Sequence, residues 1–410
     1  MAPDRAAHET MRPVLLSAYT MTSCLGRGLA PTRAAMRSPR SGLAPCRFET
    51  VELATFVGEI AGVDAEKVPA NMMRFDCRNN RAAEAGLAQD GFIEAAEESA
   101  RRHGRHRVGV FMGTSTAGIL QTELAYRRRD AADGSLPADF DYRSTHNVFS
   151  IAEYVRERLA LQGPCAAIST ACSSSAKAFA SAVRLMEAGL IDAAVVGGVD
   201  TLCLTTLYGF NSLQLLSAQP CRPYDAERDG ISIGEAAAFF LLERASPQAP
   251  RDALALLGVG ESCDAYHMSA PHPEGLGARM AMEAALASAG LAAESIDYVN
   301  LHGTGTPSND AAEDKAVHGL FGARVPVNST KGMTGHVLGA AGGVEAAISV
   351  LAIAEGVVPG SPGTRTLDPQ LRANYDVAGG PRELRLVMSN SFGFGGSNCS
   401  LVFGRLRDAA

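Results

Sequence analysis

This 410-residue chain has no excess of basic residues over acidic ones. Lysine and arginine together number 37, aspartate and glutamate 44, and the formal net charge is −7. Because binding to phosphate groups needs a basic surface, this balance argues against a nucleic-acid-binding protein. The hydrophobic content of 46% and the charged content of 20% are those of an ordinary globular enzyme, so disorder is not expected.

Closely paired cysteines and long apolar runs are also missing. The nine cysteines are odd in number, scattered along the chain and never arranged as C-x-x-C. This usage excludes a disulfide framework and a zinc module, and it fits the reducing cytoplasm. No uninterrupted apolar run approaches the roughly 20 residues of a membrane span. The first dozen residues contain Asp4 and Glu9 and no apolar core, so a secretory signal is not expected.

Short apolar runs alternate with helical patterns along the chain, which is typical of an α/β protein. The 42 glycines gather where strands meet helices, at turns that need a permissive backbone. Strands are expected at 14–17, 108–113, 193–198, 298–302, 325–329 and 385–390, and helices at 92–103, 173–188, 277–289 and 342–354.

A faint internal repeat divides the chain. A-A-V-V-G-G-V-D-T-L-C at 193–203 is followed by a strand at 239–243, and residues 389–403 also read as strand, glycine-rich turn and strand. A chain of this length is long for a single core. We therefore expect two similar halves, 1–250 and 251–410, that divide at a proline-containing stretch.

The most informative cysteine is Cys172, in the segment I-S-T-A-C-S-S-S-A. Residues 164–170 read as a strand that leads to a sharp turn, and apolar residues at helical spacing follow until Gly189. Free N–H groups at a helix N-terminus favour an anion, so we expect a nucleophilic thiolate with a pKa below the ~8.5 of free cysteine. The alternative is a small buried residue, which is the usual role of a lone cysteine.

Two histidines lie in glycine-rich loops at the ends of predicted strands, where ligands gather in open α/β sheets. His302 is in L-H-G-T-G-T and His336 is in G-H-V-L-G-A-A-G-G. Two neutral imidazoles that donate to one oxygen would stabilise an enolate by ~3–4 kcal/mol per good donor. Neither histidine has the spacing of a metal-binding helix motif, so no metal site is expected.

Lys331, five residues before His336, could keep that histidine neutral through its positive charge, provided that the lysine is itself paired. Glu313 and Glu345 are the candidate partners. An ordinary ion pair at a helix end remains the alternative explanation for Lys331 and Glu345.

Several motifs together resemble one family, the β-ketoacyl-acyl carrier protein synthases, which are condensing enzymes of the thiolase-like superfamily. The resemblance spans residues 12–407 and implies a five-layer α-β-α-β-α fold built from two related halves. It also implies a homodimer, or a heterodimer with a ketosynthase-like subunit. The motifs are T-A-C-S-S-S (170–175), D-A-E-R-D-G (225–230), G-E-A (234–236), D-A-Y-H-M-S (264–269), H-G-T-G-T-P-S-N-D (302–310), K-G-M-T-G-H (331–336) and N-S-F-G-F-G-G-S-N (390–398).

The resemblance assigns catalytic roles residue by residue. Cys172 matches the acylated nucleophile, and His302 and His336 match the pair that assists malonyl decarboxylation and condensation. Lys331 matches the family's lysine, salt-bridged to Glu313 with Glu345 nearby. Phe394 matches a gate whose backbone N–H joins that of Cys172 in the first oxyanion hole. Thr304, Thr306 and Ser269 match residues that contact the phosphopantetheine arm. Phe392 matches a residue that binds substrate.

The implied reaction joins an acyl group on the enzyme to malonyl-acyl carrier protein and lengthens the chain by two carbons, without a metal or an organic cofactor. D-C-R-N-N-R (76–81), M-G-T-S-T-A-G-I (112–119) and P-H-P-E-G-L-G-A (271–278) most resemble aryl polyene ketosynthases, and general fatty-acid elongation is the alternative. The sequence departs from the family at Ile231-Ser232 and Ala236, which could reshape the acyl tunnel, and at Lys177.

Three other functions compete with this assignment. A CoA-dependent thiolase would carry a second catalytic cysteine near its C-terminus, and Cys399 lies in an expected strand instead. A non-catalytic chain length factor would lack the nucleophile, and an initiating synthase would carry Cys-His-Asn.

Arginines at 74, 78 and 81 fall where related enzymes carry basic residues that dock the acidic carrier protein. A merely solvated face is the alternative for these arginines and for the basic runs at 101–107 and 127–129.

Overall fold

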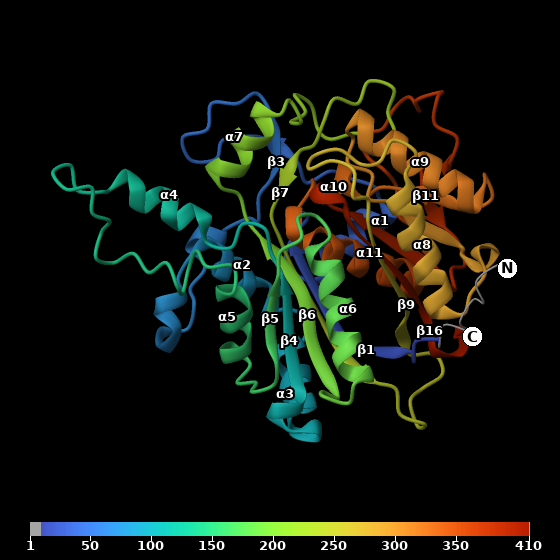
Figure 1. Ribbon diagram of the computed structural model, residues 1–410, viewed down its shortest axis with the longest axis horizontal. Helices are drawn as coiled ribbons and strands as arrows, with labels where there is room; N and C mark the ends of the chain where they lie inside the picture. The colour runs from blue at the N-terminus through green and yellow to red at the C-terminus, as the bar shows by residue number, and fades with distance from the viewer. Residues whose placement is uncertain (1–9, 410) are drawn as a thin grey trace.

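A computed structural model describes residues 10–409 of the chain. Asp4 and Glu9, on which the expectation about a secretory signal rests, lie outside the described residues. Within 10–409, eleven strands form one continuous mixed sheet, and helices lie on both of its faces (Figure 1).

Five strands from the first half of the chain form one part of this sheet. Their order is β5-β4-β6-β8-β1, with β4 parallel to β5 and β6, and with β8 antiparallel to its neighbours β6 and β1. Such strands are covered on both faces, which explains why the sequence shows continuous apolar runs rather than an alternating pattern. Their bounds are β1 Val14–Ser23, β4 Val108–Gly113, β5 Cys165–Ile168, β6 Ala193–Asp200 and β8 Ala236–Arg244.

The second half of the chain repeats this arrangement. The order β11-β10-β15-β16-β9 has the same connections and strand directions, and β13 (Asn374–Tyr375) adds a further edge beside β11. The two parts join where β1 pairs with β9. The repeated order confirms the predicted duplication, while the boundary at residue 250 stays a prediction. The bounds are β9 Leu254–Cys263, β10 Tyr298–Asn300, β11 Pro326–Asn328, β15 Val387–Phe392 and β16 Ser397–Arg405.

The helices complete an α-β-α-β-α arrangement (Figure 1). Helices α6 and α11 pack against each other and against strands of both halves. On the outer faces, α2, α3 and α5 cover the first half, and α8 and α9 cover the second. Their bounds are α2 Arg78–Leu87, α3 Phe92–His103, α5 Ser150–Arg158, α6 Ser174–Glu187, α8 Leu276–Ala289, α9 Pro307–Phe321 and α11 Ala341–Glu355.

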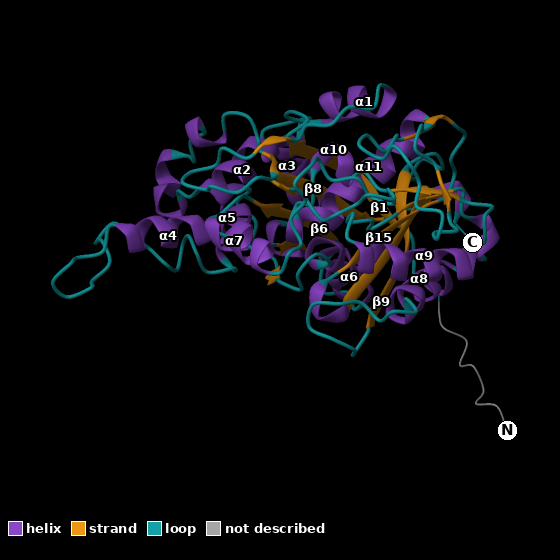
Figure 2. Ribbon diagram, turned by 90° about the horizontal axis from the view of Figure 1, so that it is seen from above, coloured by secondary structure: helices purple, strands orange, loops and turns teal. Residues whose placement is uncertain are grey.

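The remaining elements build the rim of the molecule. Seen from two directions, α4 and the loop after it project from the body as an arm (Figures 1 and 2). The bounds are α1 Leu29–Arg37, α4 Ile119–Arg127, α7 Leu204–Ser212, α10 Lys331–Thr334, β2 Ala44–Pro45, β3 Phe56–Gly58, β7 Ile233–Gly234, β12 Val357–Val358 and β14 Gly380–Pro381.

The central helix α11 is apolar on nearly every side, because strands from both halves of the sheet enclose it and it does not face water. The stretch Leu338–Glu355 is long and apolar enough to cross a membrane, yet 89% of it is buried inside the protein. Its composition is therefore accounted for by its place in the core.

Candidate active site

Cys172 lies on a tight turn between β5 and α6. The preceding residue, Ala171, has φ of 54°, a left-handed conformation that is unfavourable for a residue with a side chain. Ser174 holds the turn, because its hydroxyl donates to the carbonyl of Ala171 and accepts the N–H of Thr170 at 2.9 Å. The sequence prediction of a strand, a sharp turn and a helix here is confirmed, although α6 begins two residues after the cysteine.

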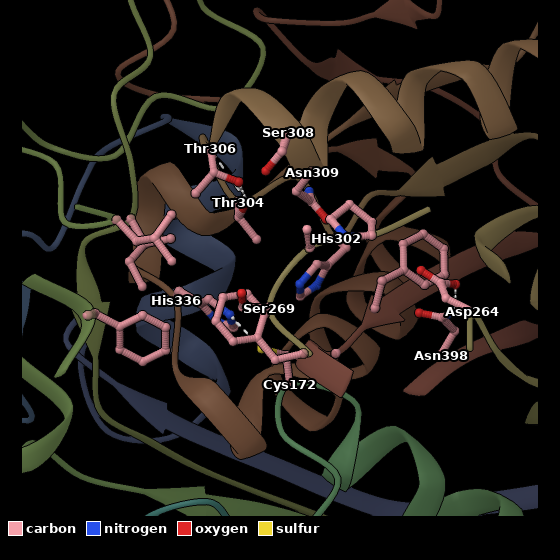
Figure 3. Close-up of a pocket in the computed structure, with 18 residues that line it drawn as sticks. Cys172, Asp264, Ser269, His302, Thr304, Thr306, Ser308, Asn309, His336 and Asn398 are labelled. Atoms are coloured by element: carbon pink, nitrogen blue, oxygen red, sulfur yellow. Dashed lines mark hydrogen bonds between the residues drawn. The ribbon is translucent and has the colours of Figure 1, made fainter. Parts of the chain in front are cut away.

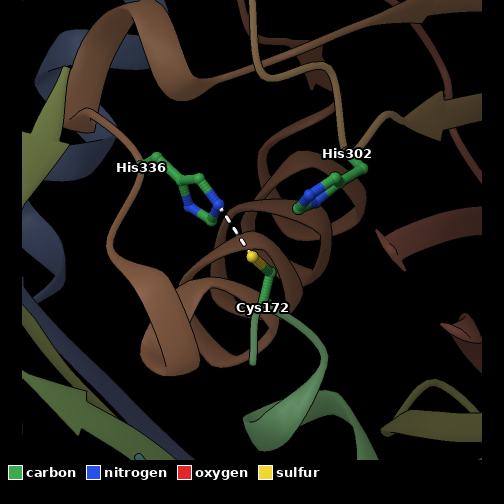
Figure 4. A group of neighbouring side chains, drawn as sticks. All are labelled: Cys172, His302 and His336. Atoms are coloured by element: carbon green, nitrogen blue, oxygen red, sulfur yellow. Dashed lines mark hydrogen bonds between the residues drawn. The ribbon is translucent and has the colours of Figure 1, made fainter. Parts of the chain in front are cut away.

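The two predicted histidine loops meet over this cysteine (Figure 4). His336 Nε2 lies 3.0 Å from Cys172 Sγ. The ring of His302 is nearly perpendicular to that of His336, with 5.3 Å between the ring centroids. All three side chains are buried. The cysteine and two histidines that lie more than a hundred positions further along the chain thus form one reactive cluster.

Lys331 lies behind His302 rather than in the cavity. Its Nζ contacts Glu345 Oε1 and the carbonyl oxygen of His302, and it lies 3.2 Å from His302 Nδ1. Because an ammonium group only donates hydrogen bonds, Nδ1 must accept, and the ring proton of neutral His302 then sits on Nε2. The lysine therefore orients the N–H of His302 away from itself.

The predicted salt bridge between Lys331 and Glu313 is wrong. The partner of the lysine is Glu345, which α11 carries to it. Glu313, on α9, instead accepts the backbone N–H groups of His302 at 2.8 Å and of Gly303 at 2.7 Å. Burial raises the pKa of each carboxyl group to about 7. Backbone N–H groups oppose this rise at Glu313, and the charge of Lys331 opposes it at Glu345.

Both active-site histidines are held neutral. Burial, and then the charge of Lys331, place the pKa of His302 and that of His336 well below the usual value. Nδ1 of His336 has no hydrogen-bond partner within residues 10–409, so its tautomer is not fixed in the way that Lys331 fixes that of His302. Neutral imidazoles beside a positive lysine are suited to donating N–H to a developing oxyanion.

The expected fall in the pKa of Cys172 is wrong for the resting protein. Burial raises the pKa of this thiol to about 11, although the charge of Lys331 and the backbone N–H of Phe394 both oppose the rise. The thiol is buried, and its loss of hydration outweighs the effect of the helix N-terminus on which the expectation rested. At neutral pH the sulfur is therefore protonated.

This raised pKa predicts a steep pH dependence for alkylation of Cys172 by iodoacetamide. Since the thiolate fraction grows tenfold per pH unit below the pKa, the rate should rise about a hundredfold between about pH 7 and pH 9. Peptide mapping of the adduct separates Cys172 from the exposed Cys263. A rate that is constant over this range would mean that the thiolate is already formed at neutral pH.

A cavity opens above the cysteine and holds most of the predicted site residues (Figure 3). Ser269, Thr304, Thr306, Phe392 and Phe394 line it together with the cysteine and both histidines, whereas the lysine and the two glutamates lie behind it. The hydroxyl oxygens of Thr304 and Thr306 lie 2.9 Å apart. Other lining residues were not singled out from the sequence, among them Phe210, Leu215, Asp264, Ser308, Asn309 and Asn398.

Asp264 and Asn398 could have been found from their motifs. They belong to D-A-Y-H-M-S and G-G-S-N, and Asn398 Nδ2 donates to Asp264 Oδ1 at 2.7 Å. The backbone N–H of Asp264 donates to the carbonyl of Gly396 at 2.9 Å, and that of Gly395 donates to Met268 at 2.8 Å. These bonds tie the loop after β9 to the turn that carries Phe394.

Three potential metal ligands meet in this cluster. The ligand atoms of Cys172, His302 and His336 lie within 4.8 Å of one another. These residues come from three separate segments of the chain, so the local spacing around each histidine does not show whether they bind a metal together. The absence of a metal from the working site therefore stays a prediction.

The predicted docking patch is not an exposed basic surface. Arg78 is 5% exposed and pairs with Glu235, because helix α2 turns it inward. Arg81 forms two hydrogen bonds with Asp76, and Arg74 faces Glu157. Of the basic runs, 127–129 lies where α4 ends in the projecting arm, and 101–107 lies at the end of α3.

Comparison with known proteins assigns this geometry to a family. Residues 27–248 match the N-terminal domain of beta-ketoacyl synthases, and residues 254–365 match their C-terminal domain. The chain belongs to the β-ketoacyl synthase family. A 3-oxoacyl-[acyl-carrier-protein] synthase 2 from Vibrio cholerae is 34% identical over 419 residues, which cover 96% of this chain and 99% of the relative.

Other members of the family are similarly close. Nodulation protein E of Rhizobium meliloti is 37% identical over 76% of this chain and 80% of its own length. Among solved structures, the ketosynthase ApeO from Xenorhabdus doucetiae, in complex with its chain length factor ApeC, is 38% identical with a TM-score of 0.85. That match covers 96% of this chain and 98% of the solved chain, and it confirms the thiolase-like fold.

Proposed function

We propose that this β-ketoacyl synthase joins an acyl group held on Cys172 to a malonyl group held on acyl carrier protein, with loss of CO2. The observation that carries this proposal is the 3.0 Å contact between Cys172 Sγ and His336 Nε2 at the base of a cavity that also holds His302. A nucleophile and two N–H donors at one point are what a two-stage thioester condensation requires.

In the first stage, Cys172 Sγ attacks the carbonyl carbon of the acyl thioester. The bond from sulfur to carbon forms, the bond to the phosphopantetheine sulfur breaks, and the thiol proton ends on that departing sulfur. The backbone N–H groups of Cys172 and Phe394 both act on the sulfur, since each opposes the rise in the pKa of the thiol. They are therefore placed to stabilise the negative charge that develops on the adjacent carbonyl oxygen.

In the second stage, malonyl carrier protein replaces the first carrier. Its carboxylate departs as CO2, and the electron pair of the broken bond forms an enolate whose oxygen accepts N–H groups from His302 and His336. The enolate carbon attacks the acyl carbonyl, the bond to Cys172 breaks, and the thiolate takes up a proton from solvent. Lys331 supports this stage by keeping the ring proton of His302 on Nε2.

The other predicted site residues act around these groups. Glu345 neutralises Lys331, and Glu313 holds the backbone of His302. Ser269, Thr304, Thr306 and Phe392 line the route of the phosphopantetheine arm, and Phe394 is the gate. Neither stage calls for a metal or an organic cofactor, because the substrates arrive on the carrier arm.

The competing functions are less well supported. A thiolase would carry a second catalytic cysteine near its C-terminus, but Cys399 is buried in β16, and burial raises its pKa further than that of Cys172. A chain length factor would lack the nucleophile, whereas this chain carries the full cluster. Aryl polyene assembly is our proposed pathway, supported by 38% identity to ApeO, and fatty-acid elongation is the alternative, supported by 34% identity to the Vibrio relative.

We also propose that the chain works in the cytoplasm and pairs with a second ketosynthase-like subunit, either another copy or a chain length factor. ApeO was solved with such a factor, and so was the ketosynthase of the ishigamide system. Strand β5 supports this pairing, because it is the edge of the sheet and each of its four residues is partly exposed.

Intact-mass spectrometry of the protein mixed with acyl carrier proteins tests this function. We expect an acyl adduct on Cys172, which malonyl carrier protein discharges as a product two carbons longer. Preference for polyene over saturated acyl groups would select the pathway, and the native mass would give the subunit composition. No adduct with any acyl group, in the presence of a candidate partner subunit, would contradict the proposal.

A further inference from the structure

Arg78 is an arginine whose charge is enclosed by the protein. Its Nε lies 2.6 Å from Glu235 Oε1 and its Nη2 lies 3.0 Å from Glu235 Oε2, so the two side chains form a bidentate pair. A further nitrogen donates to Asp64 at 2.6 Å, and the guanidinium lies 5.0 Å from the ring centroid of Phe48. Burying such a pair is costly, and replacing it with apolar residues often does no harm to stability. The buried pair therefore points to a role other than stability.

Glu235 connects three segments around the active site. It is fully buried and accepts the backbone N–H groups of Ile60 and Leu202, each at 2.9 Å. Leu202 lies two residues before α7, the helix that brings Phe210 to the wall of the cavity. The carboxylate can accept from all of these groups only while it is held in place, and the fork of Arg78 contacts both of its oxygens.

Strand β7 links Glu235 directly to His336. The N–H of His336 donates to the carbonyl of Ser232 at 2.7 Å, and the N–H of Gly234 donates to the carbonyl of His336 at 3.0 Å. The N–H and the carbonyl of the histidine are therefore both held by residues 232–234, which lead directly into Glu235. On the other side of β7, the N–H of Glu235 donates to the carbonyl of Gly58, in β3, at 2.8 Å.

Two glycines bring the histidine turn into direct contact with this strand pair. A Cβ atom added to Gly234 would lie 2.3 Å from the carbonyl oxygen of Thr334, and one added to Gly58 would lie 2.7 Å from it. At these two positions the backbones of β3 and β7 approach the turn directly. A displacement of β7 would therefore move His336, whose Nε2 contacts Cys172.

We infer that Arg78 and Glu235 are positioning residues, which hold His336 in register with Cys172 through β7. The part of this inference that concerns turnover rests on the proposed function, whereas the part that concerns the reactivity of Cys172 does not. The carrier-docking role that the sequence suggested for Arg78 is replaced by this one.

Arg78→Met tests the inference, with Arg158→Met as the matched control. Arg158, at the end of α5, also forms a bidentate ion pair, but with Glu84 and not with Glu235. A misplaced catalytic group costs between about tenfold and a hundredfold in rate. We expect such a loss in kcat for Arg78→Met, with KM for malonyl carrier protein changed less than about twofold, and a similar loss in the rate of Cys172 alkylation. Arg78→Lys should recover part of both rates, and Arg158→Met should match the wild type.

A raised KM with unchanged kcat and unchanged alkylation would show that Arg78 docks the carrier protein, and it would overturn the inference. If Arg78→Met does not fold, Arg78→Met combined with Glu235→Gln removes both charges and avoids an unpaired buried carboxylate. Wild-type alkylation and kcat in that folded double variant would also overturn the inference. If the wild type condenses nothing, the proposed function fails, while the comparison of alkylation rates still tests the positioning of His336.

Discussion

Replacing Cys172 with alanine is expected to abolish covalent acylation and to lower condensation by at least about a thousandfold. Enzymes that lose their nucleophile fall to the residual rate provided by binding and the oxyanion hole, and losses of about a millionfold are known. Cys172 is small and enclosed, so its replacement leaves only a minor gap and the fold should persist. Intact-mass spectrometry measures the adduct, and circular dichroism with thermal unfolding checks the fold.

Cys263→Ala is the control for this variant, because Cys263 is an exposed thiol that an acyl donor could modify unspecifically. It should form the adduct with the same stoichiometry as the wild type. An adduct on Cys172→Ala would assign the nucleophile to another cysteine, and condensation retained by that variant would remove covalent catalysis from the mechanism.

Replacing His302 with alanine is expected to separate the two stages of the reaction. The acyl group should still reach Cys172, but its discharge by malonyl carrier protein should fall by about a hundredfold to a thousandfold, the cost of losing one oxyanion-hole donor. The physical reason is the orientation of the ring, whose N–H is directed away from Lys331. Single-turnover mass spectrometry with preformed acyl-enzyme measures the discharge alone.

His318→Ala is the matched control, because His318 lies on α9 near the surface and outside the cavity. It should discharge the acyl group at the wild-type rate. Normal discharge by His302→Ala would show that the enolate is stabilised elsewhere. Failure of His302→Ala to accept the acyl group would instead place His302 in the first stage.

Local features of the site were predictable from the sequence because they depend on neighbours in the chain. The turn at Cys172 follows from an apolar strand, small serines and helical spacing, all within about twenty residues. The loops of His302 and His336 follow from glycines after short strands. The duplicated fold was also predictable, from the resemblance of the motifs to a known family and from the similar strand patterns in the two halves.

Features that depend on distant residues were not predictable. Both Glu313 and Glu345 were reasonable partners for Lys331, and only the packing of α11 against the sheet brings Glu345 to it. Arg78 reads as a surface arginine, since its partner Glu235 lies 157 positions away. Asp264 and Asn398 were visible in their motifs, but their shared place at the cavity depends on the pairing of β9 with β16.

The sequence by itself determined the reactive groups of this protein, which are a cysteine on a strand–helix turn and two histidines in glycine-rich loops. The tertiary structure alone decided how these groups are charged. The pKa of Cys172 is raised and the histidines are neutral because burial removes water from all three, while Lys331 adds one fixed positive charge. Solvation and charge act through space rather than along the chain, so the fold must be known before their combined effect on these pKa values can be determined.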